Sequence, residues 1–246
     1  MSAPRLTRWA LAVSALLGGC GDTGQARTTL PISAAGTAPE TVSVGEWEVT
    51  VTSARLAFGP VYLCSAQNAG LESCGQAAAE HLGATTFDAL APTPTPMGTM
   101  TGITGVTVLS GMWDYGRTWR LSEVEPHPLP SAVDGQHSAI LEVAARHEDG
   151  TNRSYRFVLD VDGRTQPSGS TAVRARLSAH ALSPSDRGLV VRFDPTLWAS
   201  MIDYDALALL PEPSPGATTE VPPDHAAADA LTIALTATAL PSFDWQ

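Results

Sequence analysis

Short runs of alternating apolar and polar residues are the feature that most limits how this chain can fold. Residues 47–52 alternate with the two-residue period of a strand that buries one face. Residues 54–58 continue the alternation on the opposite parity. Because one extra residue reverses which side chains point inward, the change of parity predicts a β-bulge near Ser53 and Ala54.

The clearest local prediction is a β-hairpin. Residues 138–146 and 155–161 are two strand-like runs, and the segment 148–151 between them contains Asp-Gly. Asp-Gly between alternating runs is the strongest short-range hairpin signal, since both residues accept the left-handed conformations of a tight turn. Further strands are predicted at residues 61–64, 101–109, 172–182, 189–193 and, as a last strand, 241–245.

Helix is predicted in only a few places. Residues 76–82 have a helix-favouring composition that suits one or two turns. Asp194 followed by Pro195 favours a helix start, and Asp224 is a candidate N-cap for a helix over residues 225–235. With many short strands and no alternation of strand and helix, the sequence predicts an antiparallel β-sandwich with one or two short helices.

The first twenty residues resemble a secretory leader. Arg5 and Arg8 precede an almost wholly apolar run over residues 9–17, which is about half of the roughly 20 residues needed to cross a bilayer as a helix. Two glycines and Cys20 follow. A positive start, a short apolar run and a small-residue exit are typical of a signal peptide.

The segment 17–20, Leu-Gly-Gly-Cys, resembles the lipobox of bacterial lipoproteins. The resemblance implies cleavage before Cys20, a diacylglyceryl group on its thiol, and at least two acyl chains, palmitate among them. Two chains hold a protein stably on a bilayer. The absence of Asp at position 21 favours the outer membrane if the source is Gram-negative. An ordinary signal peptide of a soluble secreted protein and a short buried helix are the alternative interpretations.

The rest of the chain is predicted to consist of a tether and one domain. Residues 20–41 are rich in Gly, Ala, Thr and Pro without periodicity, so they are expected to form a flexible tether after the lipidated Cys20. Residues 1–19 are the predicted leader, and residues 42–246, after the tether, are predicted to form a single β-rich domain. Within it, residues 211–223 are predicted to form a Pro-rich loop.

Cys64 and Cys74 are the two cysteines left for a disulfide. Outside the cytosol thiols oxidise and disulfides persist. The chain-entropy model gives roughly 3 kcal/mol for closing a loop of about eleven residues. Two free thiols or a metal pair are the alternatives, although the sequence has no CxxC to support a metal site.

Charge narrows the range of partners. All 14 basic residues are Arg, against 25 acidic residues, and the formal net charge is -11. Nucleic acids and anionic membrane surfaces attract clustered cations, so neither is an expected partner. An acidic surface favours an envelope protein or a small ligand instead.

Two histidines form the only candidate metal site. His127 and His137 bracket a polar, Pro-rich stretch with Glu125 and Asp134 nearby, and such a loop could offer two imidazoles and a carboxylate to Zn or Cu. The spacing matches no standard site, so solvated loop histidines are the alternative. No metal or other cofactor is predicted.

Residues 160–163, Asp-Val-Asp-Gly, resemble the start of a calcium loop, but the glycine comes too early, which favours a turn after a strand.

Three aromatic residues, Trp113, Tyr115 and Trp119, are candidates for ligand stacking, with core packing as the alternative. No nucleophile elbow, zinc-protease motif or phosphate-binding loop occurs, so no catalytic residue is predicted and the enzyme question stays open. The sequence favours a lipid-anchored, non-enzymatic binding or structural module. A metal-binding lipoprotein and a secreted hydrolase with a dispersed catalytic set are the alternatives.

Overall fold

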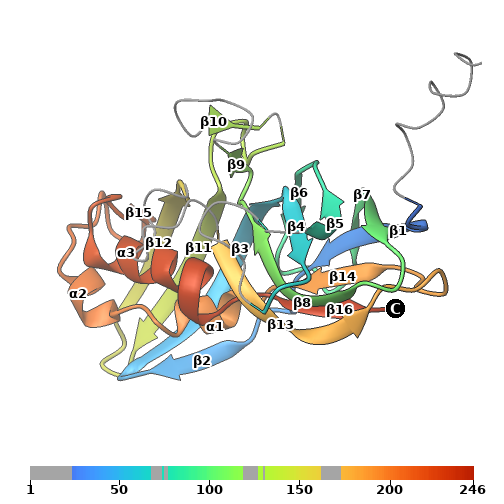
Figure 1. Ribbon diagram of the computed structural model, residues 1–246. Coiled ribbons are helices and arrows are strands. Elements are labelled where there is room, and N and C mark those ends of the chain that lie inside the picture. Colours follow the sequence, from blue (N-terminus) through green and yellow to red (C-terminus); the bar gives the residue numbers. More distant parts are fainter. Residues whose placement is uncertain (1–23, 68–73, 75–76, 119–126, 130, 162–172) are drawn as a thin grey trace, which may run out of the picture.

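The computed structural model describes residues 24–67, 74, 77–118, 127–129, 131–161 and 173–246 (Figure 1). Two large β-sheets, a two-stranded ribbon and a group of short helices make up this part of the chain, and the predicted mostly β sandwich is confirmed. Figure 1 places the helices at one side of the molecule and the start of the first strand at the opposite side.

The larger sheet has eight strands in the order β13-β8-β4-β5-β7-β1-β14-β16. Its neighbours are antiparallel except for β1 and β14, which run parallel. The strands are β1 (Arg27–Ala35), β4 (Val61–Cys64), β5 (Ala77–His81), β7 (Thr95–Ile103), β8 (Thr107–Trp113), β13 (Val173–Ala181), β14 (Leu189–Arg192) and β16 (Ser242–Trp245).

The smaller sheet follows the order β15-β12-β11-β3-β2, with β6 also paired to β3. Only β12 and β15 are parallel among its described pairs. A separate two-stranded ribbon joins β9 and β10. The strands are β2 (Thr41–Val44), β3 (Trp47–Phe58), β6 (Thr85–Asp88), β9 (Arg117–Thr118), β10 (His127–Pro128), β11 (Ala139–His147), β12 (Asn152–Leu159) and β15 (Thr219–Glu220).

Three short helices lie beside the smaller sheet: α1 (Pro195–Ala199), α2 (Tyr204–Ala208) and α3 (Ala226–Ile233), and α3 continues as a π-helix over Ala234–Thr238. The carboxylate of Asp194 accepts from the first amides of α1, and Asp203 does the same for α2, so both caps supply partners for amides that a helix start leaves free. None of the described helices has the length and apolar character needed to span a membrane.

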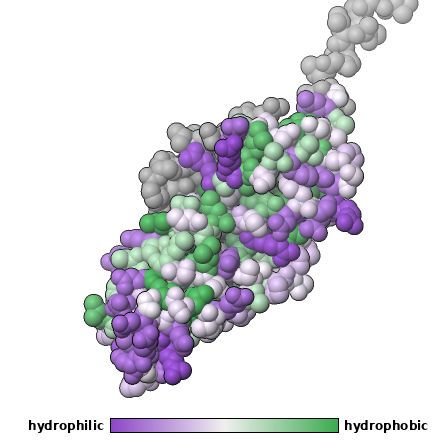
Figure 2. Space-filling view, turned by 90° about the horizontal axis from the view of Figure 1, so that it is seen from below, coloured by the Kyte–Doolittle hydropathy of each residue, from purple (hydrophilic) through white to green (hydrophobic). Residues whose placement is uncertain are grey.

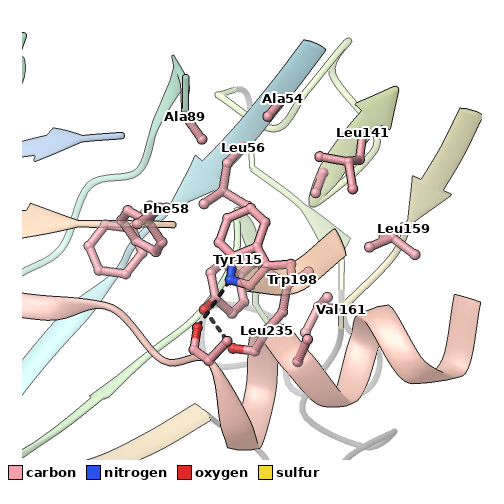
Figure 3. Packing of buried hydrophobic residues seen from close by; sticks show 14 of the residues in the cluster. Ala54, Leu56, Phe58, Ala89, Tyr115, Leu141, Leu159, Val161, Trp198 and Leu235 are labelled. Atoms are coloured by element: carbon pink, nitrogen blue, oxygen red, sulfur yellow. Dashed lines mark hydrogen bonds between the residues drawn. The ribbon is translucent and has the colours of Figure 1, made fainter. Parts of the chain in front are cut away.

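One apolar core joins both sheets and the helices. Figure 3 shows side chains from β3, β11, β12 and the helical segment packed together. Two aromatic residues also donate to the π-helix and the residue after it: the Tyr115 hydroxyl to Leu235 O at 2.8 Å, and Trp198 Nε1 to Ala239 O at 3.1 Å. Burial raises the pKa of Tyr115 well above its ordinary value, so its hydroxyl remains a proton donor.

Side chains bring the two edges of the larger sheet together. The rings of His180 on β13 and Trp245 on β16 stack at 4.0 Å with an angle of 7° between their planes. Asp186 lies 3.0 Å from His180 Nε2, and Phe243 of β16 lies 5.4 Å from Trp113 of β8. The sheet is therefore curved almost into a barrel, and ring contacts cover the seam between its edge strands.

The hairpin, the bulge and the last strand are confirmed. Arg146 of β11 lies opposite Asn152 of β12 across the predicted Asp-Gly turn. The register between β3 and β11 shifts so that Thr52 is the extra residue, one position before the predicted bulge. Ser242–Trp245 forms β16, as the C-terminal pattern predicts.

The predicted tether over residues 20–41 is wrong from Arg27 onward. Residues Arg27–Ala35 form β1 in the interior of the larger sheet, and Leu30 and Ile32 are 1% and 0% exposed. The prediction failed because two large apolar residues among Pro, Thr and Ala give almost no periodic signal. Strands on both sides, β7 and β14, supply the missing stability.

Three further local predictions are corrected. Residues 76–82, expected to be helical, contain strand β5, because pairing with β4 and β7 overrides the helix propensity of alanine. The single strand expected at 101–109 is two strands, β7 and β8, separated by a turn at Gly105 with a φ of +80°. The cap of α3 is His225 rather than Asp224.

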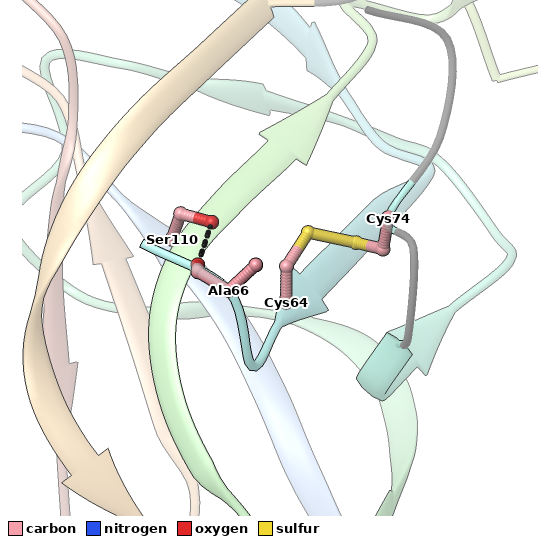
Figure 4. The surroundings of a disulfide bond; sticks show 4 residues. All are labelled: Cys64, Ala66, Cys74 and Ser110. Carbon is pink, nitrogen blue, oxygen red and sulfur yellow. Dashed lines mark hydrogen bonds between the residues drawn. A yellow bond between two sulfur atoms is a disulfide. The ribbon is translucent and has the colours of Figure 1, made fainter. Parts of the chain in front are cut away.

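The predicted disulfide between Cys64 and Cys74 is present (Figure 4). Cys64 is fully buried at the end of β4. The hydroxyl of Ser110 on β8 donates to Ala66 O at 2.7 Å, just after this strand. The disulfide therefore joins Cys74 to β4, and the hydrogen bond joins Ala66 to β8.

The position of β1 predicts that Ile32→Ala destabilises the domain. Deleting a fully buried branched side chain should lower the free energy of unfolding by about 2–5 kcal/mol. Thr29→Ala, at an exposed position of the same strand, is the matched control and should cost less than about 1 kcal/mol. Denaturant titration of both variants checks this, and equal stabilities would contradict a buried β1.

Candidate functional site

The aromatic candidates do not form a surface site. Trp113 and Tyr115 are 0% exposed and belong to the core, so the interpretation as ligand-stacking residues is wrong for both. Phe58 packs between them and Phe193 in edge and tilted arrangements. Trp119 lies outside the described residues.

The histidine candidates are only partly described. His137 Nδ1 lies 3.0 Å from Asp160 Oδ1, and the guanidinium of Arg117 lies 3.7 Å from the same oxygen. Asp134, a possible further ligand, pairs with Arg55 at 2.6 Å instead. The side chain of His127 lies outside the described part, as does all of Glu125. Within the described residues, no group of three or more His, Cys, Asp or Glu side chains is arranged to hold a metal ion.

Asp160 also borders a groove of about 390 Å³ between β12 and α3. One wall consists of residues 158–160, and Pro223 lies at the groove as well. The other wall is a helical face with Ala228, Thr232 and Thr236 spaced four residues apart. Both threonine hydroxyls donate to carbonyls four residues back, so this face presents methyl groups and small side chains.

Two side chains give the groove its chemical character. Ile233 is 42% exposed, and it lines the groove. Asp229 is exposed beside it, and no described basic side chain forms an ion pair with this carboxylate. The groove thus combines an apolar surface with an unpaired negative charge.

The apolar surface continues past the groove onto α1. The Thr238 hydroxyl lies 3.1 Å from Met201 Sδ and 3.5 Å from Ile233 O and can donate its hydrogen to either, so Met201 lies close to the end of the π-helix. Met201 and Leu197, four residues earlier, are 38% and 45% exposed. Exposed apolar side chains that adjoin a groove are typical of an interaction surface.

The sequence offered little to identify this groove. Its two walls are about 70 residues apart in the chain, and only the four-residue spacing of small residues on α3 is visible as a pattern. In the sequence, Asp160 stands out only as part of the segment that resembles a calcium loop.

A second polar cluster lies where the β2–β3 and β11–β12 turns meet. His147 Nε2 is 3.1 Å from Glu46 Oε2, and His147 Nδ1 is 3.0 Å from Asp149 Oδ1. The imidazole also packs on Trp47 at 4.7 Å, and Trp47 Nε1 donates to Asp205 of α2 at 2.8 Å. Figure 2 shows hydrophilic side chains gathered at this end of the molecule, on the left of the view.

The hydrogen bond with Asp149 and the negative charges of Asp149, Glu46 and Asp205 raise the pKa of His147, although desolvation opposes the shift. A raised folded-state pKa stabilises the fold below the unfolded value, near 6.5, and this contribution is lost as pH rises through the folded pKa. The structure therefore joins the two turns through an interaction of His147 that weakens at higher pH, while the hydrogen bond from Trp47 to Asp205 joins β3 to α2.

This predicts that the free energy of unfolding falls less in His147→Gln than in the parent when pH rises from about 5.5 to about 8. Glu46→Gln should reduce the pH dependence in part, while Glu148→Gln, an exposed neighbour, should leave it unchanged. Denaturant titrations at the two pH values measure the free energy of unfolding of the parent and of each variant. An unchanged pH dependence in His147→Gln would refute this role.

Comparisons with known proteins give no family for this chain. No family model matches it, and no curated protein does either. Among solved structures, MbnP from Methylosinus trichosporium is similar with a TM-score of 0.37 and 14% identity, over 73% of this chain and 79% of that one. A similarity at this level is too low to assign a fold or a function.

Proposed function

We propose that this protein is a non-enzymatic binding module of the bacterial cell envelope, held on a membrane by acyl chains on Cys20, and that the groove between β12 and α3 is its binding site. The observation that carries the proposal is the groove itself. It combines the apolar Ile233, the unpaired Asp229 and a strand edge within about 390 Å³. Concave sites that are largely apolar with a few oriented polar groups are the usual form of a binding site.

The charge of the groove indicates the charge of its ligand. An unpaired carboxylate beside an apolar wall favours a ligand that carries a positive group on an apolar body. The net charge of -11 adds a long-range attraction for the same kind of ligand.

The position of β1 affects how the domain sits at a membrane. Since β1 begins at Arg27, only residues 21–26 separate it from Cys20, and six residues reach at most about 20 Å. The start of β1 lies on the opposite side of the molecule from α3 (Figure 1). Acylation at Cys20 would therefore keep the domain close to the bilayer with the groove turned away from it.

The anchor is tested by Cys20→Ala, expressed from the full chain in a bacterial host. The variant should incorporate no radiolabelled palmitate and should leave the membrane fraction. The parent should remain there, because two acyl chains bind stably. The disulfide of the variant should stay intact, which serves as the control for folding. Membrane retention of Cys20→Ala without any acyl label would refute anchoring through this residue.

The groove is tested with phenethylammonium as a small probe and phenethyl alcohol as its neutral counterpart. Amide resonances of Val158, Asp229 and Ile233 should shift with the first probe and much less with the second. Thr232→Arg fills the groove and neutralises its charge, so it should weaken probe binding by about tenfold or more. Ala226→Arg, exposed on the same helix, is the matched control and should bind as the parent does. Equal binding by both variants would exclude the groove.

A further inference from the structure

We infer that the groove receives an extended peptide segment of a partner protein, which adds as a strand to the part of the β12 edge that no described strand occupies and places a basic side chain against Asp229. This inference rests on the proposed function of the groove and specifies its partner. Four features support it: the backbone direction of β12, the way β15 ends, the walls of the groove and its charge.

The backbone of β12 turns groups that have no partner among the described residues toward the groove. Leu159 O accepts from Ser138 N on the β11 side, whereas Arg156 O accepts from Val221 N on the opposite side. In an antiparallel strand successive residues face alternate sides. The amide and carbonyl of Val158, and those of Asp160 after it, therefore face the groove.

The chain already uses this edge once. Thr219 and Glu220 of β15 pair with Tyr155 and Arg156 of β12, and no described strand pairs with β12 beyond Arg156 on that side. The segment Pro222–Pro223 follows directly. Proline has no amide hydrogen to donate to a sheet, so β15 ends there, and no described strand occupies the next part of the edge.

The walls of the groove suit an extended segment. Val158 and Leu159 are successive residues, whose side chains point to opposite faces of the sheet, and both line the groove. The groove therefore runs along the edge of the strand. The opposite wall, α3 with its π-helix, turns the small side chains of Ala228 and Thr232 toward the groove. Added peptide strands gain affinity from main-chain hydrogen bonds and specificity from alternate side chains.

The charge of the groove points to the side chain that the peptide carries. The Asp160 carboxylate is already shared by Arg117 and His137, so it has little need of another cation. Asp229 has no such partner among the described residues. An Arg or Lys of the added strand would pair with Asp229 while its neighbours contact Ile233.

The experiment uses the full mature domain and a short acetylated, amidated peptide of alternating valine and threonine with one central arginine. Binding is followed by amide resonances and by hydrogen exchange at Val158 and Asp160. In the free protein both amides should exchange fast, and the peptide should slow them. A peptide N-methylated on one edge should bind about tenfold more weakly, because it cannot form those hydrogen bonds.

The charge contact is tested by exchanging arginine for glutamate in the peptide and by Asp229→Asn in the protein. Asp229→Asn should weaken binding of the arginine peptide by about threefold to fivefold, as expected for the loss of an exposed ion pair. Asp224→Asn, also exposed but outside the groove, is the matched control and should not change binding. Neither substitution removes a hydrogen bond within the described fold.

The outcomes separate this inference from the proposed function. Slowed exchange at Val158 and Asp160 that is lost on N-methylation supports strand addition. Binding of phenethylammonium without any effect of the peptide overturns strand addition and leaves the groove as a small-ligand site. Equal binding by the N-methylated peptide also overturns strand addition. If neither probe binds, both proposals are wrong.

Discussion

Strand β1 connects two parts of the larger sheet that have no other backbone link among the described strands. It pairs antiparallel with β7 on one edge and parallel with β14 on the other, and β16 is attached only through β14. Leu30 and Ile32 on its inner face enter the common core. The curvature of the sheet, and the contact of His180 with Trp245 at its seam, depend on this strand being in place, because both edges must reach each other.

The second constraint is the helical group, which closes the core beside the smaller sheet. Tyr115 and Trp198 donate to backbone carbonyls of the π-helix and the residue after it, and these bonds attach the end of the helical segment to the core. A π-helix is rare and is often found at functional sites, since its wider turn displaces the side chains that follow. Here Thr236 of the π-helix lines the groove. The same helical segment therefore contacts the core and forms part of the candidate site.

Carboxylate–imidazole pairs recur at the periphery of the molecule. His147 lies between Glu46 and Asp149, His180 pairs with Asp186, and His137 pairs with Asp160. The pairs with Glu46 and Asp160 lie at the ends of the β3–β11 and β11–β12 strand pairs, and the other two link residues within one turn or loop. The acidic composition supplies these partners in excess, so carboxylates such as Asp229 have no cationic partner among the described residues.

The amino-acid sequence alone determined those features whose cause is local. The hairpin at the Asp-Gly turn, the bulge next to Ser53, the Asp194 cap and the opportunity for a disulfide between Cys64 and Cys74 all follow from neighbouring residues or from thiol chemistry. The tertiary structure decided the rest. The segments that became β1 and β5 have weak or helix-favouring composition, and only strands on both sides make them part of a sheet. The groove likewise depends on Val158 and Ile233, which are far apart in sequence and meet only after the helical group packs on β12, since no local pattern encodes which distant surfaces pack together.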